Sequence, residues 1–161
     1  MASGYSKSMN RLRVALLALG AIACGDPTGP PLLIDASALE ISVEASATTV
    51  SLASSEDSIL VRVRAFNPLP FAVTVADQPD AGAPAHVWWT AGIVPLDPDP
   101  AARVHSVNGG GALTLGPGEG RTVVVRIDVH DPLSPLHPGE YRVLGGLEGA
   151  RAPSRRLHVT P

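Results

Sequence analysis

The chain is poor in the residues from which most active sites are built. It has one cysteine, Cys24, and only 4% aromatic residues among 161. A single cysteine excludes an internal disulfide and a cysteine-rich zinc site. The motifs G-x-S-x-G of serine hydrolases and H-E-x-x-H of zinc hydrolases are also absent from the sequence. We therefore expect a protein that is not an enzyme, with no catalytic residue and no cofactor.

Positive charge is also scarce. No lysine follows Lys7, and the formal net charge is −3. Three of the 12 basic residues and none of the 15 acidic residues precede Cys24, so the remainder of the chain carries a net charge of −6. An acidic domain lacks the basic patch by which proteins bind nucleic acid or an anionic membrane surface. The charge balance therefore argues against a nucleic-acid partner.

The sequence has no apolar run long enough for a transmembrane helix. The segment Val14–Ala23 would span roughly 15 Å as a helix, about half of the hydrocarbon core of a bilayer. It follows the basic residues Lys7, Arg11 and Arg13 and ends in small residues. A basic start, a short apolar stretch and small residues at the cut are typical of a secretory signal. We predict a signal-peptide helix within residues 1–23.

The residues at the end of this signal, Ala21-Ile22-Ala23-Cys24, resemble the lipobox of bacterial lipoproteins. In that family the cysteine thiol receives a diacylglycerol and the chain is cut before it. The resemblance implies that lipid on Cys24 anchors the protein in the bacterial cell envelope, on the periplasmic face or at the outer membrane. Ala21 stands where the family usually has leucine, and Ala21–Ala23 also fits an ordinary A-x-A cleavage site. Secretion without an anchor is the alternative.

The part after the signal has the composition of one small domain. Residues 24–37 are rich in Gly, Pro, Asp and Ser and are expected to form a flexible tether, and residues 38–161 a single domain. The 16 glycines and 16 prolines are spread along the chain, which indicates short elements joined by turns.

Apolar and polar residues alternate in several short segments, and none shows helical periodicity. The expected strands are Leu39–Val43 with a weak continuation at Val50 and Leu52, Ser58–Phe66, 71–76, His86–Thr90, Val104–Val107, Thr122–Val129, Glu140–Leu144 and Arg156–Val159. The run Ser58–Ala76, broken by Asn67–Pro70, is interpreted as two neighbouring antiparallel strands. The pattern predicts an all-β antiparallel sandwich of about 7–9 strands.

The last third of the chain resembles immunoglobulin-like bacterial modules. The matching segments are Leu115–Glu119, Val123–Ile127 and Pro138–Val143. They look most like the BsuPI family, named for an intracellular proteinase inhibitor of bacilli, and like fibronectin-type domains. The resemblance implies an immunoglobulin-like fold and, as one alternative function, proteinase inhibition. Tyr141 stands at a strand start, where its hydroxyl is expected to reach a nearby carbonyl as in a tyrosine corner.

Trp88 and Trp89 are the strongest candidates for ligand binding. Adjacent residues of a strand face opposite ways, so one indole should enter the core and the other should face outward. An outward tryptophan can stack on a sugar or anchor a protein partner. The alternative is that the loop 77–84 or 95–100 covers the second indole.

Histidines provide a weaker candidate. His130, Asp131 and His137 share one proline-rich loop, but none of the five histidines shows the spacing of a known metal site. Solvated loop histidines are the simpler interpretation, and a periplasmic metal-binding protein is the alternative. The function that the sequence predicts is a non-catalytic binding or structural domain of a cell-envelope lipoprotein.

Overall fold

The computed structural model describes residues 29–55, 58–76, 86–96, 103–133 and 135–161. Within these ranges the chain forms β-strands and one short 3₁₀ helix. No helix among the described residues is long and apolar enough to cross a membrane. The predicted signal peptide and Cys24 lie outside the described residues, so both remain predictions.

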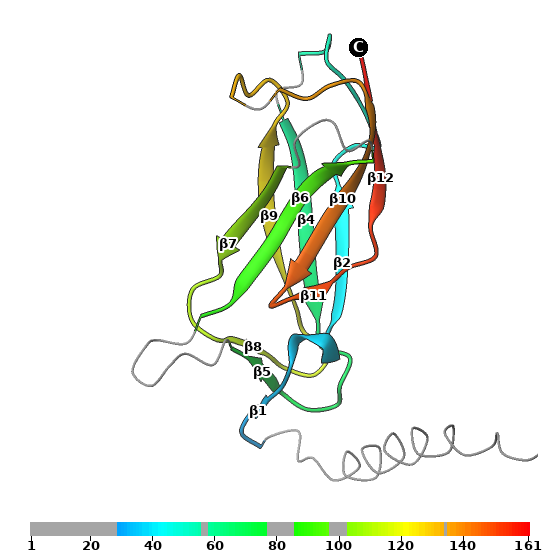
Figure 1. The fold of residues 1–161 in the computed structure, drawn as a ribbon. Helices are drawn as coiled ribbons and strands as arrows, with labels where there is room; N and C mark the ends of the chain where they lie inside the picture. Colours follow the sequence, from blue (N-terminus) through cyan, green and yellow to red (C-terminus); the bar gives the residue numbers. More distant parts are fainter. Residues whose placement is uncertain (1–28, 56–57, 77–85, 97–102, 134) are drawn as a thin grey trace, which may run out of the picture.

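The elements follow one another from β1 to β12 (Figure 1). Their bounds are β1 Leu32–Leu33, η2 Ala36–Ala38, β2 Glu40–Ala45, β3 Thr49–Ser51, β4 Ser58–Phe66, β5 Val73–Val75, β6 Trp88–Pro95, β7 Arg103–Asn108, β8 Leu113–Leu115, β9 Gly120–Asp128, β10 Gly139–Leu147, β11 Ala150–Arg151 and β12 Arg155–Thr160.

Two main sheets face each other across one hydrophobic core. The smaller has the order β2-β4-β9, and the larger has the order β3-β12-β10-β6-β7 with β11 paired to β10. Every second residue of the long strands is buried between the sheets, as in Ile59, Val61 and Val63 of β4. Period-two alternation places these side chains on one face of each strand, and their burial stabilises the pair of sheets. The all-β sandwich predicted from the sequence is confirmed.

A small third sheet, β1-β5-β8, closes the lower end of the sandwich (Figure 1). Residues 73–75 form its central strand: they pair with β1 in parallel and with β8 in antiparallel orientation. The interpretation of Ser58–Ala76 as two neighbouring strands was therefore wrong, because β5 does not pair with β4. The chain leaves the smaller main sheet at Asn67.

Asn67 explains this departure. Its side chain is fully buried, and its Nδ2 donates to the carbonyls of Phe71 at 2.9 Å, Leu115 at 3.2 Å and Gly116 at 3.0 Å. Its Oδ1 accepts from the Leu69 N–H at 3.0 Å. Buried main-chain carbonyls need such partners. One amide therefore joins the end of β4 to β8 and holds β5 away from β4.

The segment around Val50 also differs from the prediction. Residues 49–51 do not continue β2 but form β3, which pairs in parallel with β12 of the opposite sheet, with Val50 beside Val159. The chain crosses between the two sheets at residues 46–48, and this crossing buries Val50 on the core side of the larger sheet. The sandwich is therefore antiparallel except for two short parallel pairings.

The tether predicted at residues 24–37 ends earlier than expected. β1 and most of η2 lie inside that range, and Ala36 is buried. Asp35 caps η2 by accepting a hydrogen bond from the Ser37 N–H at 2.8 Å. The hydrogen bonds from Ser37 hold the pKa of the Asp35 carboxyl below its usual value. The folded domain thus begins by Leu32.

Tyr141 forms the expected tyrosine corner. Its ring is buried at the start of β10, and its hydroxyl donates to the His137 carbonyl at 2.9 Å. The same oxygen accepts from the His137 N–H at 3.2 Å. These bonds fix the loop before β10 against the core.

Candidate binding site

β6 places the two tryptophans on opposite faces of the larger sheet. Trp89 is 1% exposed within the core, whereas Trp88 is 39% exposed on the outer face. The expectation of one inward and one outward indole is confirmed. The loops proposed to cover the second indole lie largely outside the described residues, but much of the Trp88 surface is accessible.

Three contacts hold Trp88 in place. Its main-chain N–H donates to Glu148 Oε1, and the Glu148 N–H donates to the Trp88 carbonyl at 3.0 Å. The His86 ring meets the indole edge-on, with 5.5 Å between ring centroids. Glu148 and Gly149 both have positive φ, 45° and 80°, as a tight type I′ hairpin turn requires. The turn between β10 and β11 thus braces the strand that presents the indole.

Eight neighbouring outward positions on β6, β7 and β10 carry no charged side chain, although Arg142 of β10 lies beside Val94 and Arg151 of β11 lies beside Gly146. The residues of β6, β7 and β10 that share this outer surface alternate with core residues. We call them the uncharged face: Trp88, Thr90, Gly92, Val94, Val104, Ser106, Leu144 and Gly146. Trp88 and Val104 are its most exposed apolar members, and Val104 is 47% exposed.

Charged residues border the uncharged face where β10 meets β11 and β12, and Glu148 lies at its Trp88 end. Arg142 of β10 lies opposite Arg156 of β12, and Glu140 lies opposite His158. Glu140 Oε1 and His158 Nδ1 are 2.7 Å apart, and both side chains are about half exposed. The face therefore changes from aromatic and hydroxyl groups at Trp88 to ionic groups near β12.

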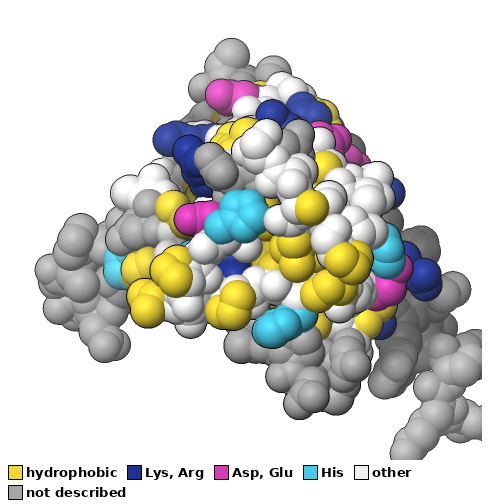
Figure 2. Space-filling model, turned by 90° about the horizontal axis from the view of Figure 1, so that it is seen from above, with side chains coloured by type: hydrophobic (Ala, Val, Ile, Leu, Met, Phe, Trp, Pro, Cys, Tyr) yellow, Lys and Arg dark blue, Asp and Glu magenta, His cyan; other side chains and the backbone are white. Residues whose placement is uncertain are grey.

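The predicted metal candidates do not assemble into a site among the described residues. His130, Asp131 and His137 all lie in the connection between β9 and β10, but no group of three or more His, Cys, Asp or Glu residues in the described chain is placed to hold a metal ion. Asp131 Oδ1 accepts from the Leu133 N–H at 2.9 Å, so it shapes the loop. Figure 2 shows this end from above, with histidine side chains lying apart from one another. The metal-binding alternative gains no support.

Arg103 is a buried charge that the sequence did not reveal. It opens β7 and is only 7% exposed, opposite Ile93 of β6. Its Nη1 donates to the Asp128 carbonyl, while Nε and Nη2 are buried and have no hydrogen-bond partner among the described residues. The strand predicted from the sequence begins at Val104, so the alternation did not indicate that the preceding Arg103 is buried.

Comparison with known proteins supports the fold and goes no further. No protein-family model matches the chain, and no curated protein matches it. Among solved structures, the Pseudomonas fluorescens alkylpurine DNA glycosylase AlkC bound to DNA containing an abasic site analog has a TM-score of 0.52 and 16% identity, over 78% of this chain and 31% of that one.

Two β-glucosidases, from Listeria innocua in complex with glucose and from Erythrobacter marinus, have TM-scores of 0.42 and 0.46 at 16% and 17% identity. Each match covers 76% of this chain and 16% of the enzyme, and at these scores neither carries an argument. The chain thus spans less than a third of each neighbour's length. What the glycosylase shows is that this sandwich fold also occurs as part of a larger protein.

Proposed function

We propose that the chain is a lipid-anchored, immunoglobulin-like domain of the bacterial cell envelope that binds a protein partner through the uncharged face and performs no catalysis. The immunoglobulin-like assignment is supported by the two sheet orders, β2-β4-β9 against β12-β10-β6-β7, and by the tyrosine corner at Tyr141. The anchor rests on the lipobox-like residues that end at Cys24.

The observation that carries the binding role is the exposed Trp88, held in place by its contacts, at one end of the uncharged face. Interface cores are depleted of charged residues, and tryptophan is enriched among the residues that dominate binding energy. The uncharged face extends from Trp88 past Thr90 and Ser106 to Val104 and Leu144, farther than one sugar ring would need. A protein surface therefore fits this face better than a single stacked sugar.

Site-specific photo-crosslinking in cells tests the binding role. Val104 and Val124 form a matched pair, because they are similarly exposed, at 47% and 52%, on the outer faces of different sheets. A photoreactive residue at position 104 should give a discrete adduct with another protein, and at position 124 it should not. Loss of the position-104 adduct in the Trp88→Ala variant would link the contact to the indole. Equal labelling from both positions, or none, would overturn the proposal, and glycan-array binding that needs Trp88 would replace the protein partner by a carbohydrate.

Membrane fractionation tests the anchor separately. The wild-type chain should sediment with membranes and be released by detergent, whereas Cys24→Ala should appear in the soluble fraction. If Cys24→Ala stays with the membranes, the lipid anchor is refuted, but the crosslinking result stands unaffected.

A further inference from the structure

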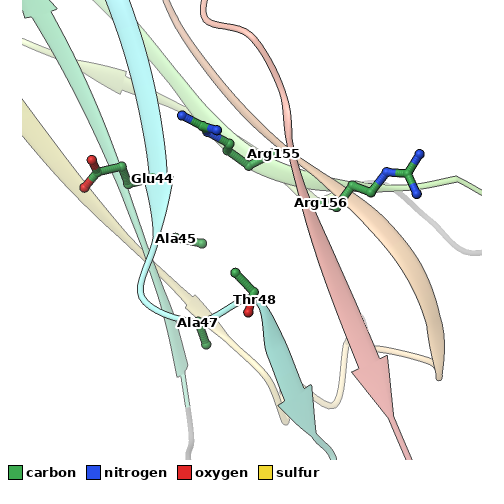
Figure 3. A pocket seen from close by; sticks show the side chains of 6 residues that line it. All are labelled: Glu44, Ala45, Ala47, Thr48, Arg155 and Arg156. Atoms are coloured by element: carbon green, nitrogen blue, oxygen red, sulfur yellow. The ribbon is translucent and has the colours of Figure 1, made fainter.

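A groove opens along one side of the sandwich, between the edge of β2 and the first half of β12 (Figure 3). Its volume is about 400 Å³, and its lining residues are Glu44, Ala45, Ala47, Thr48, Arg155 and Arg156. The groove exists because β3 pairs only with residues 158–160 of β12. The first half of β12 therefore has β10 on one side and no described strand on the other.

Main-chain groups of β12 face this groove. The His158 N–H donates to the Thr48 carbonyl at 2.9 Å, so His158 turns its main-chain groups toward the side of β3. In an antiparallel ladder, alternate residues turn both N–H and C=O to the same side. Arg156, two residues earlier, must turn its own N–H and C=O the same way, beyond the end of β3. Within the described chain no strand pairs with these groups, so they form an open strand edge.

The opposite wall is also a strand edge. β2 is the outermost strand of the smaller sheet. The Ser46 N–H donates to the Leu60 carbonyl at 2.9 Å, so the even-numbered residues of β2 bond to β4. By the same alternation, Val43 and Ala45 turn their N–H and C=O groups away from β4. The groove is thus flanked on both sides by main-chain groups that pair with no strand of the described chain, and alanine side chains line it.

Among the described residues that line the groove, one cation, Arg155, faces the gap. Arg155 shares the inward side of β12 with the buried Leu157 and Val159, and its side chain reaches toward β2 in Figure 3. Glu44 and the side chain of Arg156 point away from the groove. The charge inside the groove is therefore that of Arg155, which selects for a carboxylate.

We propose that the groove binds an extended peptide that carries an acidic residue. The peptide adds as a strand beside β12, where β3 ends, and its main chain pairs with the N–H and C=O of Arg156. A carboxylate of the peptide meets Arg155. This is strand addition to an exposed sheet edge, in which main-chain bonds supply affinity and a side-chain contact supplies selectivity. The site is separate from the uncharged face, so it stands or falls independently of the proposed function.

Synthetic peptides and a matched pair of variants test the proposal. The probe is a capped hexapeptide Glu-Thr-Val-Thr-Val-Glu, with a lysine version of the same peptide as the charge control. Binding is followed by fluorescence polarisation and by amide hydrogen exchange of the full folded domain. We expect the acidic peptide to bind at least ten-fold more tightly than the lysine peptide, and the Arg156 amide to become protected on binding.

Arg155→Glu and Arg126→Glu change the net charge equally, but only the first alters a side chain that lines the groove, because Arg126 lies on β9 at the far edge of the smaller sheet. Arg155→Glu should weaken binding of the acidic peptide at least ten-fold and reverse the preference toward the lysine peptide, while Arg126→Glu should change the affinity for the acidic peptide less than two-fold. N-methylation of alternate peptide amides should abolish binding. No binding of the acidic peptide, equal loss in the two variants, or an unprotected Arg156 amide would each overturn the proposal.

Discussion

The two outer faces of the sandwich are built from the same alternation but differ in charge. On β2, β4 and β9 the outward residues include opposite charges in register, with Glu44 beside Arg62. Even the aromatic residue there is covered, because the Arg64 guanidinium lies 5.2 Å from the centre of the Phe66 ring. On β6, β7 and β10 the uncharged face leaves Trp88 open. Water solvates the first face well, whereas the second has the composition of a contact surface.

The largest expected effect separates the two sides of β6. Trp89→Ala removes a fully buried indole and should lower the free energy of unfolding by about 3–5 kcal/mol. Trp88→Ala removes an indole on the open face and should lower it by less than about 1 kcal/mol. Urea denaturation of both variants measures the difference. If both variants lost the same free energy of unfolding, Trp88 would be a structural residue, and the outer surface of β6 would not be an open contact surface.

Two glycines, one on each outer face, differ in the space around their Cα atoms. A Cβ at Gly92 of the uncharged face would lie 2.2 Å from the Arg103 carbonyl oxygen and 2.7 Å from Val104 Cα. A Cβ at Gly120 on the charged face would lie 2.9 Å from Nε of the Arg64 side chain and, less closely, 3.1 Å from the Ala65 carbonyl oxygen. The main chain of β7 cannot move away without breaking its hydrogen bonds to β6, whereas the exposed Arg64 side chain can rotate.

Gly92→Ala should therefore lower the free energy of unfolding by about 1–3 kcal/mol. Gly120→Ala should change it by no more than about 0.5 kcal/mol, because the reduced freedom of the unfolded chain offsets the contact. Thermal denaturation of the two variants checks this. If the two variants lose the same free energy of unfolding, β7 does not lie as close to Gly92 of β6 as the structure places it.

The sequence predicted the fold class because the strands alternate cleanly. The apolar positions of residues 58–66 and the opposed directions of Trp88 and Trp89 follow from a period of two alone. Strand pairing did not follow, since alternation says which side of a strand is buried but not which strand lies beside it. The partners of residues 49–51 and 73–75 depend on a sheet crossing and on the buried amide of Asn67.

The candidate sites were predicted in part, for the same reason. The outward indole could be read from two adjacent tryptophans, but the uncharged face required the register of β6 with β7 and β10. The groove beside Arg155 required the knowledge that β3 ends before it covers β12. Sites built from neighbouring strands far apart in the chain appear only once the pairing is known.

The smallest expected effect lies on the charged face. Arg62→Glu places a carboxylate opposite Glu44 and should lower the free energy of unfolding by about 0.2–1 kcal/mol at low salt. Arg126→Glu is the matched control, because Arg126 lies opposite Leu60 and gains no like-charged partner there. The loss in Arg62→Glu should shrink at high ionic strength, since salt screens exposed charges. Urea denaturation at low and high salt measures both, and a crosslink from position 104 should persist in either variant. If the charged face bound the partner instead, the Arg62→Glu variant would lose the crosslink from position 104. That result would refute the proposal that the uncharged face is the binding surface.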